Sequence, residues 1–184
     1  MRTAARELLT KRLELRWMTE DDAGLMLAIW TDPGFVRHVG DRGVRSVEQA
    51  REAMGPALAL YDNHGYGAYR VALRDGGPAI GICGLFRRPV FDHPDIGYAL
   101  LPDWRGHGYA LEAARAVMRE ARDGVGLARV LAIVSPGHRR SITLLEKLGM
   151  QAEGAVRMPG EDDELLLYAR NFGDGAADPE RPDQ

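Results

Sequence analysis

The sequence is short of cysteine and has no long uninterrupted hydrophobic run. Its one cysteine, Cys83, excludes an internal disulfide and any metal site built from several cysteines. No stretch reaches the roughly 18 apolar residues that a membrane-spanning helix needs. There is also no basic-then-apolar leader of the secretory kind. We therefore expect a cytoplasmic protein that does not associate with a membrane.

Lysine is scarce as well, since only Lys11 and Lys147 stand among the 24 basic residues. The arginines are scattered without an obvious patch, and the net charge of -3 predicts no general attraction to nucleic acid. The 184 residues, 45% of them apolar, suit one domain with a sizeable core. We expect that domain to span residues 10–172 and to act as a monomer or homodimer. Residues 173–184 lack apolar anchors, which predicts a disordered tail.

Hydrophobic periodicity and turn residues predict an alternation of strands and helices. Strands are expected at 12–17, 66–73, 78–86, 95–101, 129–134, 150–156 and 164–170. Helices are expected after Thr19, from Ser46 to about Tyr61 with a break or restart at Pro56, from 109 to about 123, and from 139 to 148. Strands followed by a helix and then by a buried strand indicate a mixed sheet with a parallel βαβ unit. The fold class is therefore α/β.

The most informative segment joins the strand at 95–101 to the next helix through a glycine turn. Gly106 and Gly108 can adopt positive φ, and Arg105 adds a positive charge. The first amides of a helix lack intrahelical partners, so such a turn can bind phosphate. A purely structural turn is an equally good interpretation of this segment alone. Two nucleotide motifs are excluded, because Leu111 occupies the third glycine position of a dinucleotide fingerprint and no Walker-type Gly-Lys-Ser/Thr is present.

Several segments in order resemble the GNAT superfamily of N-acetyltransferases, in particular its Rim-type branch of ribosomal-protein N-terminal acetyltransferases. Arg105–Ala110 matches the Arg/Gln-x-x-Gly-x-Gly/Ala signature, and Thr10–Arg16 resembles the opening strand of that branch. Ile96–Tyr98, Ser141 and Glu146–Met150 follow with matching spacing. The resemblance extends over residues 10–170, and it is carried by the ordered set of motifs.

The resemblance implies a central mixed sheet of about seven strands with a splayed parallel pair and helices on both faces. It implies acetyl-CoA as co-substrate and no metal, with the pyrophosphate at the turn and the pantetheine between the splayed strands. Gly97 fits this arrangement, because a glycine inside a strand often marks a bulge or a close backbone approach; alternatively, glycine is merely tolerated at this position. The residues expected to bind the co-substrate are Leu100, Leu101, Arg105, Gly106, His107, Gly108, Tyr109, Ala110, His138 and Ser141.

The chemistry that the resemblance implies is direct attack of an amine on the thioester carbonyl. Where many relatives carry a tyrosine as proton donor in the last helix this sequence has Leu145, and His138 replaces a common asparagine. Ser141 is the first candidate for contact with the sulfur or the pantetheine; alternatively, its hydroxyl only bonds helix backbone. Asp95 and His93 are candidates for the base, although a carboxylate at a loop end is more often solvated surface.

The leading hypothesis is transfer of the acetyl group to a primary amine, either a protein N-terminus or a small-molecule amine. The alternative is a non-catalytic acyl-CoA-binding or regulatory domain with the same fold, which the absence of the usual tyrosine makes worth testing. Seven acidic residues form either a site for a cationic amine or ordinary surface. They are Asp32, Asp41, Glu48, Glu161, Asp162, Asp163 and Glu164. The identity of the acceptor does not follow from the sequence.

Overall fold

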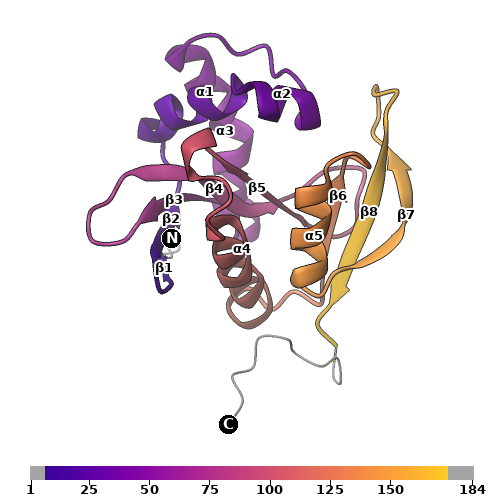
Figure 1. Cartoon of the computed structure of the whole chain (residues 1–184). Coiled ribbons are helices and arrows are strands. Elements are labelled where there is room, and N and C mark those ends of the chain that lie inside the picture. Colours follow the sequence, from indigo (N-terminus) through magenta and orange to yellow (C-terminus); the bar gives the residue numbers. More distant parts are fainter. Residues whose placement is uncertain (1–6, 174–184) are drawn as a thin grey trace.

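A computed structural model describes residues 7–173 of the chain (Figure 1). Its strands form one eight-stranded sheet in the order β1-β2-β3-β4-β5-β6-β8-β7. Every neighbouring pair is antiparallel except β5 and β6, which run parallel. The predicted α/β class with a mixed sheet is confirmed. All of the predicted tail except residue 173 lies outside the described residues.

Seven of the eight strands match the expected ones, and one further strand was not expected. The additional strand is β1, a three-residue segment that pairs with β2 at the edge of the sheet. The strands are β1 (Glu7–Leu9), β2 (Leu13–Trp17), β3 (Ala68–Leu73), β4 (Ala79–Phe86), β5 (Asp95–Leu100), β6 (Arg129–Val134), β7 (Gln151–Arg157) and β8 (Glu164–Asn171). The predicted turn between β3 and β4 is present, with positive φ at Asp75 and Gly76 as a tight hairpin requires.

The helices are α1 (Ala23–Trp30), α2 (Pro33–Val39), α3 (Val47–His64), α4 (Tyr109–Arg119) and α5 (Arg139–Lys147). Short 3-10 turns cover Glu20–Asp22 and Pro102–Trp104, and a π-helical turn at Glu120–Gly124 extends α4. The helix α2 was not expected. The predicted break at Pro56 was wrong, because α3 continues through it. Pro56 lies exposed between the buried anchors Met54 and Tyr61, so the backbone group it leaves unpaired can reach water.

Helices pack on both faces of the sheet, against two main apolar clusters. The larger cluster joins the sheet to α4 and α5, which lie in front of the strands in Figure 1. The second joins α1 and α3 to Ala68 and Ile82 of the sheet. The predicted apolar side of α4 is confirmed by burial of Ala114, Val117 and Met118. This packing fixes the carboxyl end of β5 beside the start of α4.

Cys83 lies in β4 with only 1% of its surface exposed. Burial raises the pKa of its thiol well above the usual value, so the reactive thiolate is not formed near neutral pH. The prediction of a packed structural thiol is confirmed.

Candidate functional site

The parallel strands β5 and β6 contact each other only near their amino ends. Asp95 is the one β5 residue with a register partner on β6, Leu131, and the Leu131 amide donates to the Pro94 carbonyl at 2.9 Å. On its other side, β5 pairs with β4 along its whole length. The predicted splayed pair is therefore present, and it leaves one edge of β5 without a strand partner beyond Asp95.

The hydrogen-bonding pattern identifies which backbone groups lie on that unpaired edge. Along an antiparallel pair, alternate residues direct both main-chain groups toward the partner strand. The Leu101 amide donates to Ile80 next to β4, whereas the Leu100 carbonyl accepts from Arg105 on the opposite side. The main-chain groups of Ile96, Tyr98 and Leu100 consequently face the unpaired edge. Since the Leu100 carbonyl already accepts from Arg105, both main-chain groups of Tyr98 and the Leu100 amide are left to pair with an extended ligand as a further strand would.

The bulge that was one predicted explanation for a glycine at position 97 is absent. The ladder between β4 and β5 has no register shift. A Cβ at Gly97 would lie 2.9 Å from the ring of Phe86, so glycine is needed for the close approach of that ring. The predicted close approach of another backbone or of the co-substrate at Gly97 stays a prediction, because the neighbour found here is a side-chain ring.

The glycine turn has the predicted geometry. Gly106 and Gly108 have φ of 82° and 81°, in the left-handed region that favours glycine. The first helical hydrogen bond of α4 runs from the Glu112 amide to the Gly108 carbonyl at 3.1 Å. The amides of Tyr109, Ala110 and Leu111 thus precede the first intrahelical donor and lie at the positive end of the helix dipole. The turn can therefore bind an anion directly after the unpaired edge of β5.

Arg105 is engaged in structural contacts within this turn. Its Nε donates to the Leu100 carbonyl at 2.9 Å, and its Nη2 donates to Asp32 Oδ2 at 2.5 Å. Asp32 is buried and also caps α2 by accepting from the Phe35 amide. Burial raises the pKa of Asp32, but the hydrogen bonds from Arg105 and Phe35 outweigh this and hold it below its usual value. Asp32 therefore compensates much of the Arg105 charge, and this ion pair links the turn to α2.

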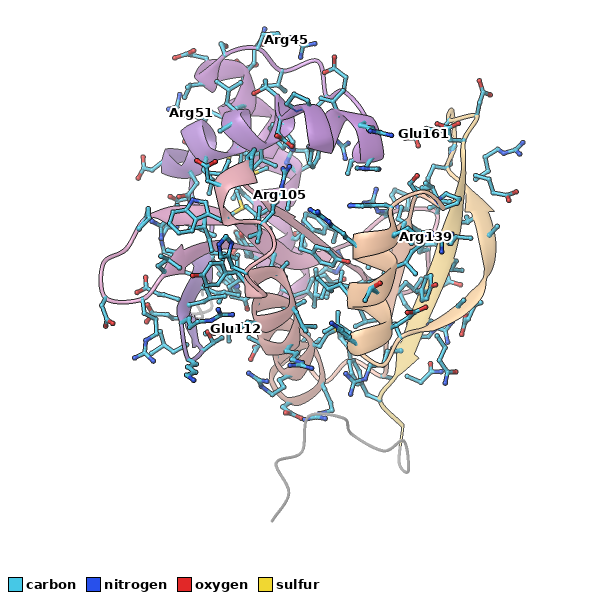
Figure 2. All side chains as sticks on the ribbon, viewed as in Figure 1. Arg45, Arg51, Arg105, Glu112, Arg139 and Glu161 are labelled. Carbon is cyan, nitrogen blue, oxygen red and sulfur yellow. The ribbon has the colours of Figure 1, made fainter. Side chains whose placement is uncertain are left out.

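Arg12 supports the other side of the turn, a contact that sequence reasoning missed. Its Nη1 donates to the His107 carbonyl at 3.0 Å, and its guanidinium lies 4.4 Å from the centre of the Tyr109 ring. Its Nε donates to Glu112 Oε2 at 2.6 Å, and Thr10 Oγ1 donates to Glu112 Oε1 at 2.6 Å. The turn before β2 therefore fixes the shape of the anion-binding loop through the Glu112 carboxylate at the start of α4, which Figure 2 labels.

A side-chain hydrogen bond links β5 to α5 across the splay. Tyr98 Oη and Ser141 Oγ are 2.7 Å apart, and either hydroxyl can donate. The alternative in which the Ser141 hydroxyl only bonds helix backbone is therefore wrong. Burial raises the pKa of Tyr98 to about 12, so its phenol stays protonated at neutral pH. Two hydroxyls thus meet beside the unpaired edge of β5.

Comparison with known proteins connects this geometry to a family. A family model described as an acetyltransferase (GNAT) domain matches residues 12–151. The chain belongs to the GNAT acetyltransferase family. It is 32% identical over 150 residues to YoaA of Bacillus subtilis, an uncharacterized N-acetyltransferase, with 80% of this chain and 84% of YoaA covered. It is 29% identical over 154 residues to p20 of Bacillus licheniformis, also an uncharacterized N-acetyltransferase, with 82% and 85% covered.

Solved structures share this GNAT fold. An acetyltransferase from Agrobacterium tumefaciens superimposes with a TM-score of 0.79 and 25% identity, covering 93% of this chain and 97% of that one. RimL, a ribosomal L7/L12 alpha-N-protein acetyltransferase solved in complex with coenzyme A, gives a TM-score of 0.77 at 18% identity, covering 90% and 98%. The expected resemblance to GNAT proteins and Rim-type structures is confirmed. The chain is an acetyl-CoA-dependent N-acetyltransferase.

His138 lies directly before α5 in this acetyltransferase and contacts α2. Its ring stacks on His38 of α2, with ring centres 4.0 Å apart and planes inclined by 4°. Burial lowers the pKa of His138, and the charges of His38, Arg105 and Arg140 lower it further. The stack links α2 to the start of α5, and the ion pair of Arg105 with Asp32 links α2 to the turn before α4.

Leu145 is 1% exposed and belongs to the larger apolar cluster. It stands four residues after Ser141, so both side chains lie on the same side of α5. The position at which many GNAT relatives carry a tyrosine is therefore filled by core packing. A phenol comes close to Ser141 from β5 instead.

The two candidate bases, Asp95 and His93, lie next to the parallel contact with β6. Asp95 is 1% exposed, and both of its oxygens accept from Arg88 Nε at 3.0 Å. The alternative prediction, that Asp95 is a solvated carboxylate on the surface, is wrong. Burial raises the pKa of Asp95, and the Arg88 charge opposes that shift. His93 is half-buried two residues earlier. Asp95 holds Arg88 in place, and the catalytic roles of both residues stay predictions.

Between residues 7 and 173, no helix is long and apolar enough to cross a bilayer. The same residues contain no cluster of three or more histidine, cysteine or acidic side chains arranged to hold a metal ion.

Proposed function

We propose that this acetyltransferase holds the pyrophosphate of acetyl-CoA at residues 105–110 and its pantetheine along the unpaired edge of β5. In this arrangement the acetyl group passes to a primary amine by direct attack. The observation that carries the proposal is that two binding elements, the unpaired edge of β5 and the glycine turn, follow one another along the chain. Both main-chain groups of Tyr98 and the amide of Leu100 are open to an extended ligand, and the anion-binding turn follows directly at the carboxyl end.

The residues present fit the co-substrate. The amides of the turn and the positive end of α4 suit the two negative charges of a pyrophosphate. Since Arg105 is paired with Asp32, main-chain amides supply most of this attraction. The pantetheine arm carries amide groups, which can pair with the free main-chain groups of β5 as a strand does. Acetyl-CoA, as substrate, supplies an acetyl group activated as a thioester.

The protein's own groups hold and move protons around that thioester. An α-amine has a pKa near ~7.7–8.0, so it must lose a proton before it can attack. Asp95 and His93 are the proposed acceptors of that proton, directly or through water. Ser141 is the proposed donor to the departing sulfur, because its hydroxyl lies beside β5 and not against its own helix.

The proposed acceptor is a protein N-terminus or a small-molecule amine. Two of the seven acidic residues considered for a cationic amine are already paired, Asp32 with Arg105 and Asp41 with Arg45. Of the other five, Glu161 lies toward the tip of the β7–β8 hairpin (Figure 2). This favours recognition of the acceptor by shape and by the exposed hairpin rather than by a buried acidic pocket.

Two measurements test this function. Calorimetric titration with CoA is expected to show saturable binding at micromolar concentrations, and no binding at high micromolar CoA contradicts the site. Thiol release from acetyl-CoA is then followed with peptides bearing free α-amines, free amino acids, polyamines and aminoglycosides, and with N-acetylated peptides as the matched control. We expect turnover with one class of free amine. Binding of CoA without turnover on any amine supports the non-catalytic alternative.

A further inference from the structure

The hydrogen bond between Tyr98 and Ser141 calls for a reason beyond packing. Tyr98 Oη lies 2.7 Å from Ser141 Oγ and makes a longer contact of 3.4 Å to the Ser141 main-chain carbonyl. Ser141 is the third residue of its helix, a position from which serine usually bonds nearby backbone. Here its hydroxyl bonds a phenol from a strand 43 residues away in sequence. The bond therefore fixes the Ser141 rotamer from outside the helix.

The geometry allows either hydroxyl to donate in this bond, and acidity favours the phenol. The phenol of Tyr98 stays protonated at neutral pH and is intrinsically more acidic than an alcohol, so it is the better donor. When Tyr98 donates to Ser141 Oγ, the Ser141 proton must point elsewhere. Since Leu145 closes the next turn of α5 with apolar atoms, the helix offers that proton no second polar side chain there.

We propose that Tyr98 is a positioning residue that donates to Ser141 Oγ and directs the Ser141 proton toward the departing sulfur. The phenol that many GNAT relatives carry on the last helix is thus replaced by one on the facing strand, acting through a serine. The inference rests on the proposed function, because it assumes that the thioester lies beside β5.

The proton transfers balance over one turnover. The amine nitrogen forms the new C–N bond, and the C–S bond breaks with its electron pair on sulfur. Sulfur takes the Ser141 proton, and Ser141 recovers a proton from Tyr98. Tyr98 regains, through solvent, the proton that the amine has released. The products are one amide and one thiol, and no proton is gained or lost.

The test compares Tyr98→Phe, Ser141→Ala and the double variant with a confirmed acceptor. Tyr98→Phe removes one hydroxyl and keeps the ring, and Tyr168→Phe in β8 is the control because Tyr168 is a strand tyrosine of the same sheet, buried where Tyr98 is half-buried. We expect kcat to fall about 100-fold in Ser141→Ala and about 10-fold in Tyr98→Phe. The KM for acetyl-CoA should change less than about twofold. The double variant should be no slower than Ser141→Ala, since Tyr98 acts through Ser141.

A second readout separates proton positioning from a structural effect. In mixtures of H₂O and D₂O, a reaction that moves two protons together gives a curved dependence of kcat on deuterium content. We expect curvature in the wild type and in Tyr168→Phe, and a straight line in Tyr98→Phe.

The outcomes distinguish this inference from the proposed function. Unchanged kcat in Tyr98→Phe, independent losses in the double variant, or unchanged curvature overturn the role of Tyr98 while leaving the acetyltransferase site intact. A wild-type protein that releases no thiol with any amine overturns the proposed function and this inference with it.

Discussion

The co-substrate side and the acceptor side of this molecule use different parts of the chain. On the co-substrate side, the groups offered to a ligand belong to the main chain: the edge of β5 and the amides of the turn before α4. On the side that we propose for the acceptor, α1, α2 and the β7–β8 hairpin offer side chains. Binding through the backbone needs glycines and a fixed spacing, which leave a pattern in the sequence. Recognition by side chains leaves no such pattern, and this is why the donor is identified and the acceptor is not.

The largest expected effect comes from breaking the co-substrate side at Gly108. A valine there would be strained at φ of 81° and would place a branched side chain beside the helix amides. We expect Gly108→Val to weaken CoA binding at least about 100-fold, about 2.7 kcal/mol, as measured by calorimetry.

Gly126→Val is the matched control for this variant. Gly126 has φ of 78°, a Cβ added there would meet no heavy atom within 4 Å, and the residue follows the far end of α4. It should lose similar stability from backbone strain, about 1–3 kcal/mol, and retain CoA affinity. Equal loss of affinity in both variants would show that the turn acts only through stability.

A smaller effect is expected at the ion pair of Asp95 with Arg88, near the amino end of β5. Asp95→Asn removes the charge partner of an arginine whose side chain is 32% exposed. Because burial already disfavours the charged carboxylate, the loss reflects a hydrogen bond rather than a charge, and we expect the free energy of unfolding, measured by urea denaturation, to fall by only about 1 kcal/mol.

Asp41→Asn, which breaks the exposed pair with Arg45, is the control and should cost clearly less. The Asp95→Asn variant also tests which residue is the catalytic base. If Asp95 accepts the amine proton, Asp95→Asn also lowers kcat, whereas His93→Gln leaves it unchanged. The reverse result assigns the base to His93.

The smallest expected effect lies in the stack of His38 in α2 on His138 before α5. Because the pKa of His138 is lowered in the folded protein, the unfolded chain binds a proton more readily below about pH 6.5. Stability is therefore unaffected above that pH and decreases as the pH falls below it.

His38→Asn removes one of the charges that lower the His138 pKa, so that pKa should rise and the acid loss should shrink. NMR titration of His138 measures the change, and His64→Asn, which lies against Tyr66, should leave the His138 titration unaltered. No change in His38→Asn would mean that the stack does not couple the two rings.

Elements with strong local signals were predictable from the sequence. The β3–β4 hairpin and the turn before α4 were recognised because glycine and aspartate specify their φ angles locally. In contrast, β1 has three residues and α2 has seven, too few for a periodic pattern, and both depend on partners distant in sequence. Continuity of α3 through Pro56 was missed because burial of Met54 and Tyr61 overrides the local preference.

Site contacts were less predictable, because they join residues far apart in the chain. Arg105 meets Asp32 across 73 positions, and Arg12 meets His107 across 95. The sequence placed Tyr98 in an expected strand but not beside Ser141, since nothing local distinguishes a phenol that packs from one that bonds a serine. The backbone part of the site was readable from the sequence, and the side-chain part required the fold.

Residue-resolved hydrogen exchange by NMR tests the central claim most directly, because it observes single main-chain amides. In the free protein, the amides of Gly97 and Ala99 are already paired with β4, whereas those of Tyr98 and Leu100 face the unpaired edge. Saturation with CoA should slow exchange at Tyr98, Leu100 and the amides of residues 106–110, and leave Gly97 and Ala99 unchanged. Saturable CoA binding with unchanged exchange at Tyr98, Leu100 and the turn would contradict a co-substrate site built from the backbone.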